Sequence, residues 1–140
     1  MAVIGFNFNK IVAERGSAPK EKVSVSNNLS IKDVEEVSIA FGKEKQKALR
    51  FLFQFESKYS PQDVGNLSID GEILYMQEPK KLKEIQEYWK KNNKLPNDVM
   101  PIVMNHILFK TNLKALNLAS DVNLPLPLPM PRVRNAGSKA

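Results

Sequence analysis

The sequence predicts an α+β fold: a four-stranded antiparallel sheet followed by a short and a long helix packed on one face. Within residues 49–56 and 67–76 one face is almost entirely apolar and the alternate positions are mostly polar, which is the period of strands that bury one face. After Pro79 the spacing of apolar residues becomes that of a helix. Residues 98–119 keep helical spacing over a much longer stretch. A short turn between the two clear strands favours antiparallel pairing.

The first two strands are predicted from weaker patterns. Residues 4–8 alternate apolar side chains with glycine and asparagine, and the buried face shifts farther on, which indicates a bulge near Lys10. Val23 and Val25 begin a second strand. The stretch that follows suits a strand, but residues 33–36 also suit a turn or a bulge. Residues 42–47 are predicted to be a charged hairpin loop.

The short helix has one narrow apolar seam formed by Leu82, Ile85 and Trp89, with Pro79 in its first turn and a stop at residues 92–96. The long helix should be capped by Asn97 or Asp98, with Pro101 in its first turn.

The long helix is apolar on two sides, whereas an ordinary surface helix has one apolar stripe. One stripe comprises Met100, Met104, Ile107, Leu108, Ala115 and Leu118, and the other comprises Ile102, Phe109, Leu113 and Leu116. We therefore expect the sheet on one side of helix 98–119 and a second copy of the chain on the other, which makes the protein a homo-oligomer.

A leucine–proline alternation over residues 124–131 follows the long helix. Because every second residue lacks an N–H group, this segment should be extended and pinned to a surface by its apolar side chains. Those side chains either cover an open end of the core or a sheet edge, or line a groove for apolar segments of non-native polypeptide. A third interpretation, a ligand for a partner's aromatic groove, requires exposure. The side chains concerned are Leu124, Leu126, Leu128 and Met130.

The order of elements resembles the SecB-like fold family over residues 4–131. Residues 71–75 stand where that family has its last strand, and Asn117–Pro125 with the Leu-Pro run stand where its long helix passes into a proline-containing crossover. The resemblance implies a homo-oligomer with sheets outside, and ATP-independent holding of unfolded polypeptide along apolar grooves. The family's bacterial chaperones are acidic and end in a further helix and a metal-binding tail for the SecA motor. This chain is basic and cysteine-free.

The net charge of +6 is concentrated in two places, residues 80–94 and the end of the chain after Pro131. Such clusters suit a polyanion and predict an alternative function, a ribosome-associated or RNA-binding protein that contacts phosphates without reading sequence. A solvated lysine-rich face and a disordered end would give the same pattern. The residues are Lys80, Lys81, Lys83, Lys90, Lys91, Lys94, Arg132, Arg134 and Lys139.

Composition argues against several other classes. The 140 residues suit one core, so we expect one domain over residues 1–131 and a basic, flexible tail over 132–140. Cysteine is absent, and His106 has no second ligand beside it, which argues against a metal site.

Asp70 and Glu72 share a strand face, which suggests the solvated side of an edge or outer strand rather than a pair of catalytic carboxylates. We expect no enzyme, metal, cofactor or small-molecule substrate. Without a signal peptide or membrane-spanning run, the expected location is the cytoplasm.

Overall fold

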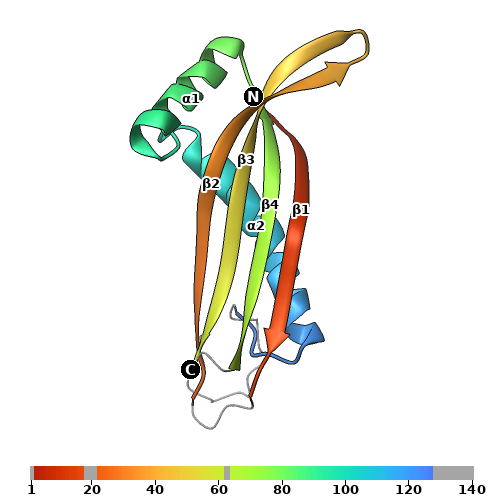
Figure 1. Cartoon of the computed structure of the whole chain (residues 1–140), viewed down its shortest axis with the longest axis vertical. Coiled ribbons are helices and arrows are strands. Elements are labelled where there is room, and N and C mark those ends of the chain that lie inside the picture. Colours follow the sequence, from red (N-terminus) through yellow and green to blue (C-terminus); the bar gives the residue numbers. More distant parts are fainter. Residues whose placement is uncertain (1, 18–21, 62–63, 128–140) are drawn as a thin grey trace, which may run out of the picture.

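The structure, a computed structural model, describes residues 2–17, 22–61 and 64–127. One antiparallel sheet has the strand order β1-β4-β3-β2, and both helices lie against one of its faces (Figure 1). Helix α1 contacts β2 and β3, whereas α2 contacts β4 and β1. The predicted α+β architecture is therefore confirmed. Its elements are β1 (Ala2–Arg15), β2 (Ser24–Phe41), β3 (Glu44–Ser60), β4 (Gly65–Met76), α1 (Pro79–Asn92) and α2 (Met100–Asp121).

The strands β3 and β4 form as their alternation predicts. Every second side chain is buried, from Leu49 to Tyr59 on β3 and from Leu67 to Tyr75 on β4. Strand β4 needs glycine at position 71. A Cβ atom there would clash, because it would lie 2.5 Å from the Phe53 ring and 2.5 Å from the Asn7 carbonyl oxygen. The sheet can thus bury a large aromatic ring directly over this backbone position.

The other two strands are longer than predicted. The bulge near Lys10 is confirmed by a register shift between Phe8 and Lys10. Strand β2 runs unbroken through residues 33–36 with a register shift between Ile31 and Asp33, so a bulge is correct there and a turn is wrong. The predicted loop 42–47 is also wrong, since only Gly42 and Lys43 form the turn.

Residues 44–48 pair with β2 alone, because the pairing of β3 with β4 begins at Leu49. This hairpin projects past the end of the sheet, as Figure 1 shows. Residues 42–47 are all exposed, so no face of the hairpin tip is buried enough to give an alternating pattern. That explains why the strand character of residues 44–47 was not visible in the sequence.

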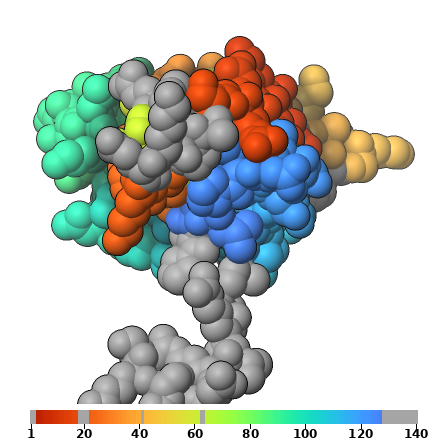
Figure 2. Space-filling view, turned by 90° about the horizontal axis from the view of Figure 1, so that it is seen from below, coloured from red at the N-terminus to blue at the C-terminus, as the bar shows by residue number. Residues whose placement is uncertain are grey.

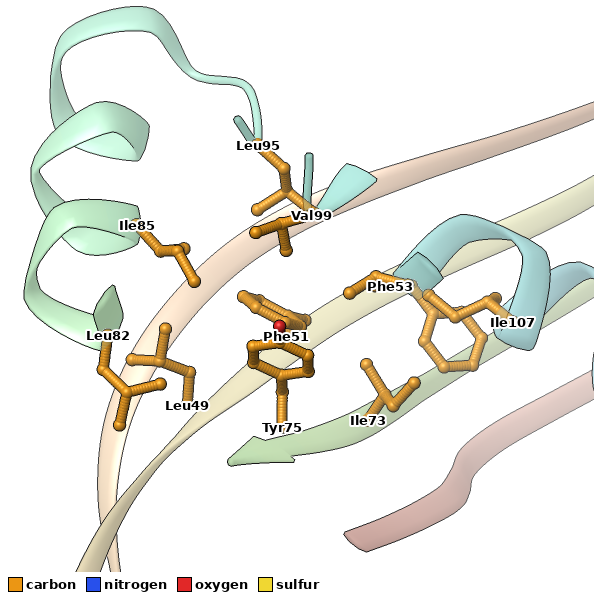
Figure 3. Close-up of a cluster of buried hydrophobic side chains, with 11 residues drawn as sticks. Leu49, Phe51, Phe53, Ile73, Tyr75, Leu82, Ile85, Leu95, Val99 and Ile107 are labelled. Carbon is orange, nitrogen blue, oxygen red and sulfur yellow. The ribbon is translucent and has the colours of Figure 1, made fainter. Parts of the chain in front are cut away.

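The core lies between the sheet and the helices in two clusters. Figure 3 shows the first, where Leu82 and Ile85 of α1 face Leu49 while Val99 and Ile107 approach the aromatic rings of the sheet. Trp89 is only partly buried against this cluster. The second cluster lies towards the other end of the sheet and comprises Phe55, Tyr59, Val64, Leu67, Ile69, Ala115, Ala119 and Leu124.

Helix α2 begins without the predicted cap. Val99 is its N-cap residue and no side chain bonds the free amides, so the assignment of Asn97 or Asp98 as cap is wrong. The Asp98 carboxylate instead accepts a hydrogen bond from Lys81 Nζ at 2.5 Å, which ties the start of α1 to the turn before α2. Pro101 lies in the first turn as predicted.

We expect this Lys81–Asp98 pair to make a pH-dependent contribution to stability. The hydrogen bond from Lys81 lowers the pKa of Asp98, so the stabilisation is present above the unfolded value of 3.8 and is lost as pH falls through the lower folded pKa. The same bond raises the pKa of Lys81, whose contribution is lost as pH rises through that raised pKa. Asp98→Asn should therefore lower the Tm slightly at pH 7, and this difference should disappear at a pH below the lowered pKa of Asp98. Identical Tm values at pH 7 would contradict this.

Candidate functional site

The outward side of α2 carries a line of exposed apolar side chains. Ile102 is 36%, Phe109 66% and Leu113 52% exposed, and Leu116 is half-buried. The steps between the first three are seven and four residues, which place them on one face of a helix. This is the second stripe that the sequence predicts. In the described part of a single chain, no element covers it.

The opposite side of α2 packs on the sheet. Its fully buried positions are four residues apart: Val103, Ile107, Thr111, Ala115 and Ala119. Ile107 and Ala115 were predicted in this stripe. The sequence interpretation missed Val103, Thr111 and Ala119, and Met100 is exposed rather than buried. Thr111 can be buried because its hydroxyl donates a hydrogen bond to the Ile107 carbonyl at 2.8 Å.

The Leu-Pro segment is fixed to the sheet through its carbonyl groups as far as residue 127. The Tyr59 hydroxyl donates to the Pro125 carbonyl at 2.5 Å, and the Asn27 amide donates to the Pro127 carbonyl at 2.9 Å. The Ser57 hydroxyl orients Asn27 by donating to its Oδ1 at 2.7 Å. Burial raises the pKa of Tyr59, so its hydroxyl keeps its proton for this bond. These bonds hold the segment across the end of the second core cluster.

The two described leucines of this segment do different things. Leu124 is 6% exposed and packs in the second core cluster, whereas Leu126 is 44% exposed. The sequence interpretation treats these leucines as one set, whereas the structure buries only the first of the two. Leu128 and Met130 lie outside the described residues.

A groove of about 450 Å³ lies beside Leu126 at this end of the molecule. Figure 2 shows this end, with the end of α2 (blue) lying against β1 (red). Ser120, which lines the groove, comes seven residues after Leu113 and so continues the same face of α2. The exposed stripe of α2 thus leads into the groove. Its lining comprises Arg15, Ser17, Val64, Ser120, Asn123, Leu124, Pro125 and Leu126.

The predicted basic residues divide into three groups. Lys81 is half-buried and paired with Asp98 and Glu84. Arg132, Arg134 and Lys139 lie outside the described residues. The remaining five are exposed and form no ion pair within the described chain; they are Lys80, Lys83, Lys90, Lys91 and Lys94.

Two further grooves flank α1. One of about 510 Å³ lies between α1 and the base of the projecting hairpin, where Lys47 of β3 joins Lys83 and Lys90. The other, of about 670 Å³, lies between α1 and the turn before α2 and is lined by Lys90, Lys91, Tyr88 and Pro96 among others. Lys47 was missed from the sequence because its segment looked like a loop.

The carboxylates of β4 lie on the sheet face away from the helices. Glu72 forms an ion pair with Arg50, in which the Arg50 Nε and Glu72 Oε2 atoms are 2.6 Å apart. Strand β4 is a central strand between β1 and β3, so the prediction of an edge position for Asp70 and Glu72 is wrong, although their face is the outer one. His106 lies beside Phe6, with ring centroids 5.8 Å apart.

Within the described chain, no three side chains of the metal-binding types come together. The described helices include none that is both long and apolar enough to cross a membrane.

Comparison with solved structures finds a similar fold. The sequence matches no protein-family model, and no curated protein matches it. The fold is similar to that of a Mycobacterium tuberculosis SecB-like chaperone, Rv1957, solved in complex with a ChAD peptide from the Rv1956 HigA1 antitoxin. The two chains are 13% identical with a TM-score of 0.46, and the match covers 96% of this chain and 91% of that chain.

Proposed function

We propose that this protein is a non-enzymatic, SecB-like chaperone-type protein that binds non-native polypeptide on exposed apolar surface and assembles with itself through α2. The observation that carries the proposal is the apolar stripe on the outward side of α2, which continues into the groove beside Leu126. Soluble monomers rarely leave a large contiguous apolar surface open, and such surfaces mark interaction sites.

This surface is long and has two parts. From Ile102 to Ser120 the helix rises by about 27 Å, at 1.5 Å per residue, which is long enough to pack along a second helix. The part beside Leu126 is irregular, and an apolar groove of this kind makes few demands on the order of side chains in its ligand. It therefore suits the varied segments that unfolded proteins expose.

We assign the two parts of the surface to different partners. Phe109 and Leu113 lie in the middle of a regular helix, and the same face on a second copy offers a matching helix for side-by-side packing. Leu126 lies in an irregular segment beside a hollow, where an extended client chain can enter. The α2 stripe would then hold the oligomer together, while the Leu126 groove remains open to polypeptide.

Aggregation of a chemically unfolded substrate tests the client-binding part. The wild-type protein should suppress the light scattering of the diluted substrate, and Leu126→Asp should weaken suppression about tenfold or more, because one leucine contact is worth about 1.5–3 kcal/mol. Ile4→Asp, a similarly exposed apolar position on β1, is the matched control and should suppress normally. Equal suppression by wild type and Leu126→Asp would refute the assignment of this groove.

A second candidate function, contact with RNA phosphates, is favoured by one observation: Lys47, Lys83 and Lys90 line the same groove. An RNA binder should co-sediment with ribosomes at low salt and dissociate steeply as salt rises. Reversing the charges of Lys83 and Lys90 should then release it. Failure of these reversals to change sedimentation would leave the lysines as a solvated surface.

A further inference from the structure

We propose that the grooves flanking α1 select polypeptide segments in which two carboxylates, three residues apart, neighbour apolar side chains. This inference rests on the proposed polypeptide-binding function and adds a charge preference to it. No residue of the Leu126 groove takes part, so the two sites can be tested separately.

The first groove supplies cations above an apolar floor. Lys83 and Lys90 enter it from α1, while Pro79 and Leu82 contribute apolar lining. Lys47 is paired with Glu36 at 3.2 Å, so its charge is largely satisfied. Lys83 and Lys90 have no such partner within the described residues and are exposed, so their ammonium groups remain available to a ligand.

The second groove adds an aromatic contact. Tyr88 is 37% exposed and lies with Pro96 in the lining, beside Lys90 and Lys91. Lys90 lines both grooves and therefore stands on the ridge between them. A ligand that lies along α1 on this ridge can meet the apolar lining of both grooves, with Lys90 between them.

The spacing of the lysines sets the spacing of the carboxylates. Lys83 and Lys90 are seven residues apart on one helix face, so their backbones are separated by about 10.5 Å along the axis. Three residues of a chain in the polyproline II conformation span about 9 Å and complete one turn, so side chains three residues apart point to the same side. An Asp or Glu at each end of such a step can therefore reach both lysines, and the apolar side chains beside them can meet the lining of the grooves.

The same grooves fit a nucleic acid less well. Glu87 lines both grooves, and Glu36 and Glu84 line one each. A phosphate backbone carries a charge at every nucleotide and would bring phosphates near these carboxylates, whereas a peptide has charges only where its sequence puts them.

Fluorescence anisotropy with the full-length protein and three labelled peptides tests the preference. The peptides share one apolar sequence and differ at two positions three residues apart, which hold glutamate, serine or lysine. At 150 mM salt the glutamate peptide should bind about tenfold more tightly than the serine peptide, since two exposed ion pairs together reach this size, and the lysine peptide should bind most weakly. Lys83→Gln with Lys90→Gln should make the glutamate and serine peptides bind equally.

The matched control is Lys32→Gln with Lys43→Gln, which removes the same charge from two exposed lysines that line neither groove and should leave the preference intact. Equal binding of the glutamate and serine peptides to wild type would overturn the inference but leave the proposed function standing. Absence of binding by all three peptides would overturn both. An RNA hairpin that binds more tightly than the glutamate peptide and displaces it would assign the lysines to RNA and overturn the inference.

Discussion

Replacing Phe109 and Leu113 together with aspartate should convert the assembled protein into a folded monomer. Both side chains are more than half exposed in the single chain, so the fold does not depend on them. In an assembly that packs α2 against a second copy, each buried apolar side chain is worth about 1.5–3 kcal/mol, and a buried carboxylate adds a further penalty. The dissociation constant for self-association should therefore rise at least about a hundredfold.

Sedimentation velocity over a range of protein concentrations measures this change. Asn105→Asp with Asn117→Asp is the matched control, because it adds two carboxylates at exposed positions of the same helix beside the apolar stripe. The control should assemble like wild type, and the thermal unfolding of the Phe109/Leu113 variant should stay two-state. A wild-type protein that is monomeric at micromolar concentration would refute self-association through α2.

The elements that the sequence predicts well are those with one buried and one wet face. Strand β3 alternates the buried Phe51, Phe53 and Phe55 with less buried and mostly polar residues, since only one face of the sheet is covered by helices. The start of α1 at Pro79 is predicted because proline is favoured in the first turn of a helix, where its missing N–H group would have no partner within the helix. In these elements the local sequence pattern agrees with the tertiary environment, so the pattern alone is sufficient to predict the secondary structure.

The sequence cannot tell which stripe of α2 faces the sheet, because both stripes are apolar. The buried side uses Val103 and Ile107 in its first half and the small residues Thr111, Ala115 and Ala119 in its second half. By side-chain hydrophobicity alone, the exposed stripe with Phe109 and Leu113 ranks as highly as the buried stripe. The sequence therefore shows that α2 has two apolar stripes, but it does not show which of them faces the sheet.

The candidate site depends on contacts between residues distant in sequence. The Pro125 carbonyl is bonded by Tyr59 and the Pro127 carbonyl by Asn27, at separations of 66 and 100 residues. These bonds determine that Leu124 points into the core while Leu126 remains exposed. The Leu-Pro alternation predicts an extended and pinned segment, but its regular spacing contains nothing that distinguishes the two leucines.

Leu124→Ala and Leu126→Ala should separate the structural from the functional leucine. Leu124 packs in the second core cluster, so its truncation leaves a cavity and should lower the free energy of unfolding by about 2–4 kcal/mol. Leu126 is exposed, so its truncation should change that free energy by no more than about 0.5 kcal/mol. Denaturant titration measures both, and each variant should retain the wild-type m-value.

The same pair should show the opposite order in client binding. Below the unfolding transition, Leu124→Ala should still suppress aggregation of an unfolded substrate, whereas Leu126→Ala should suppress it less well although the domain is as stable as wild type. A loss of stability in Leu126→Ala equal to that in Leu124→Ala would place both side chains in the core and remove Leu126 from the binding surface. Because both changes remove the same atoms from neighbouring positions of one segment, a difference between them can come only from what each leucine contacts.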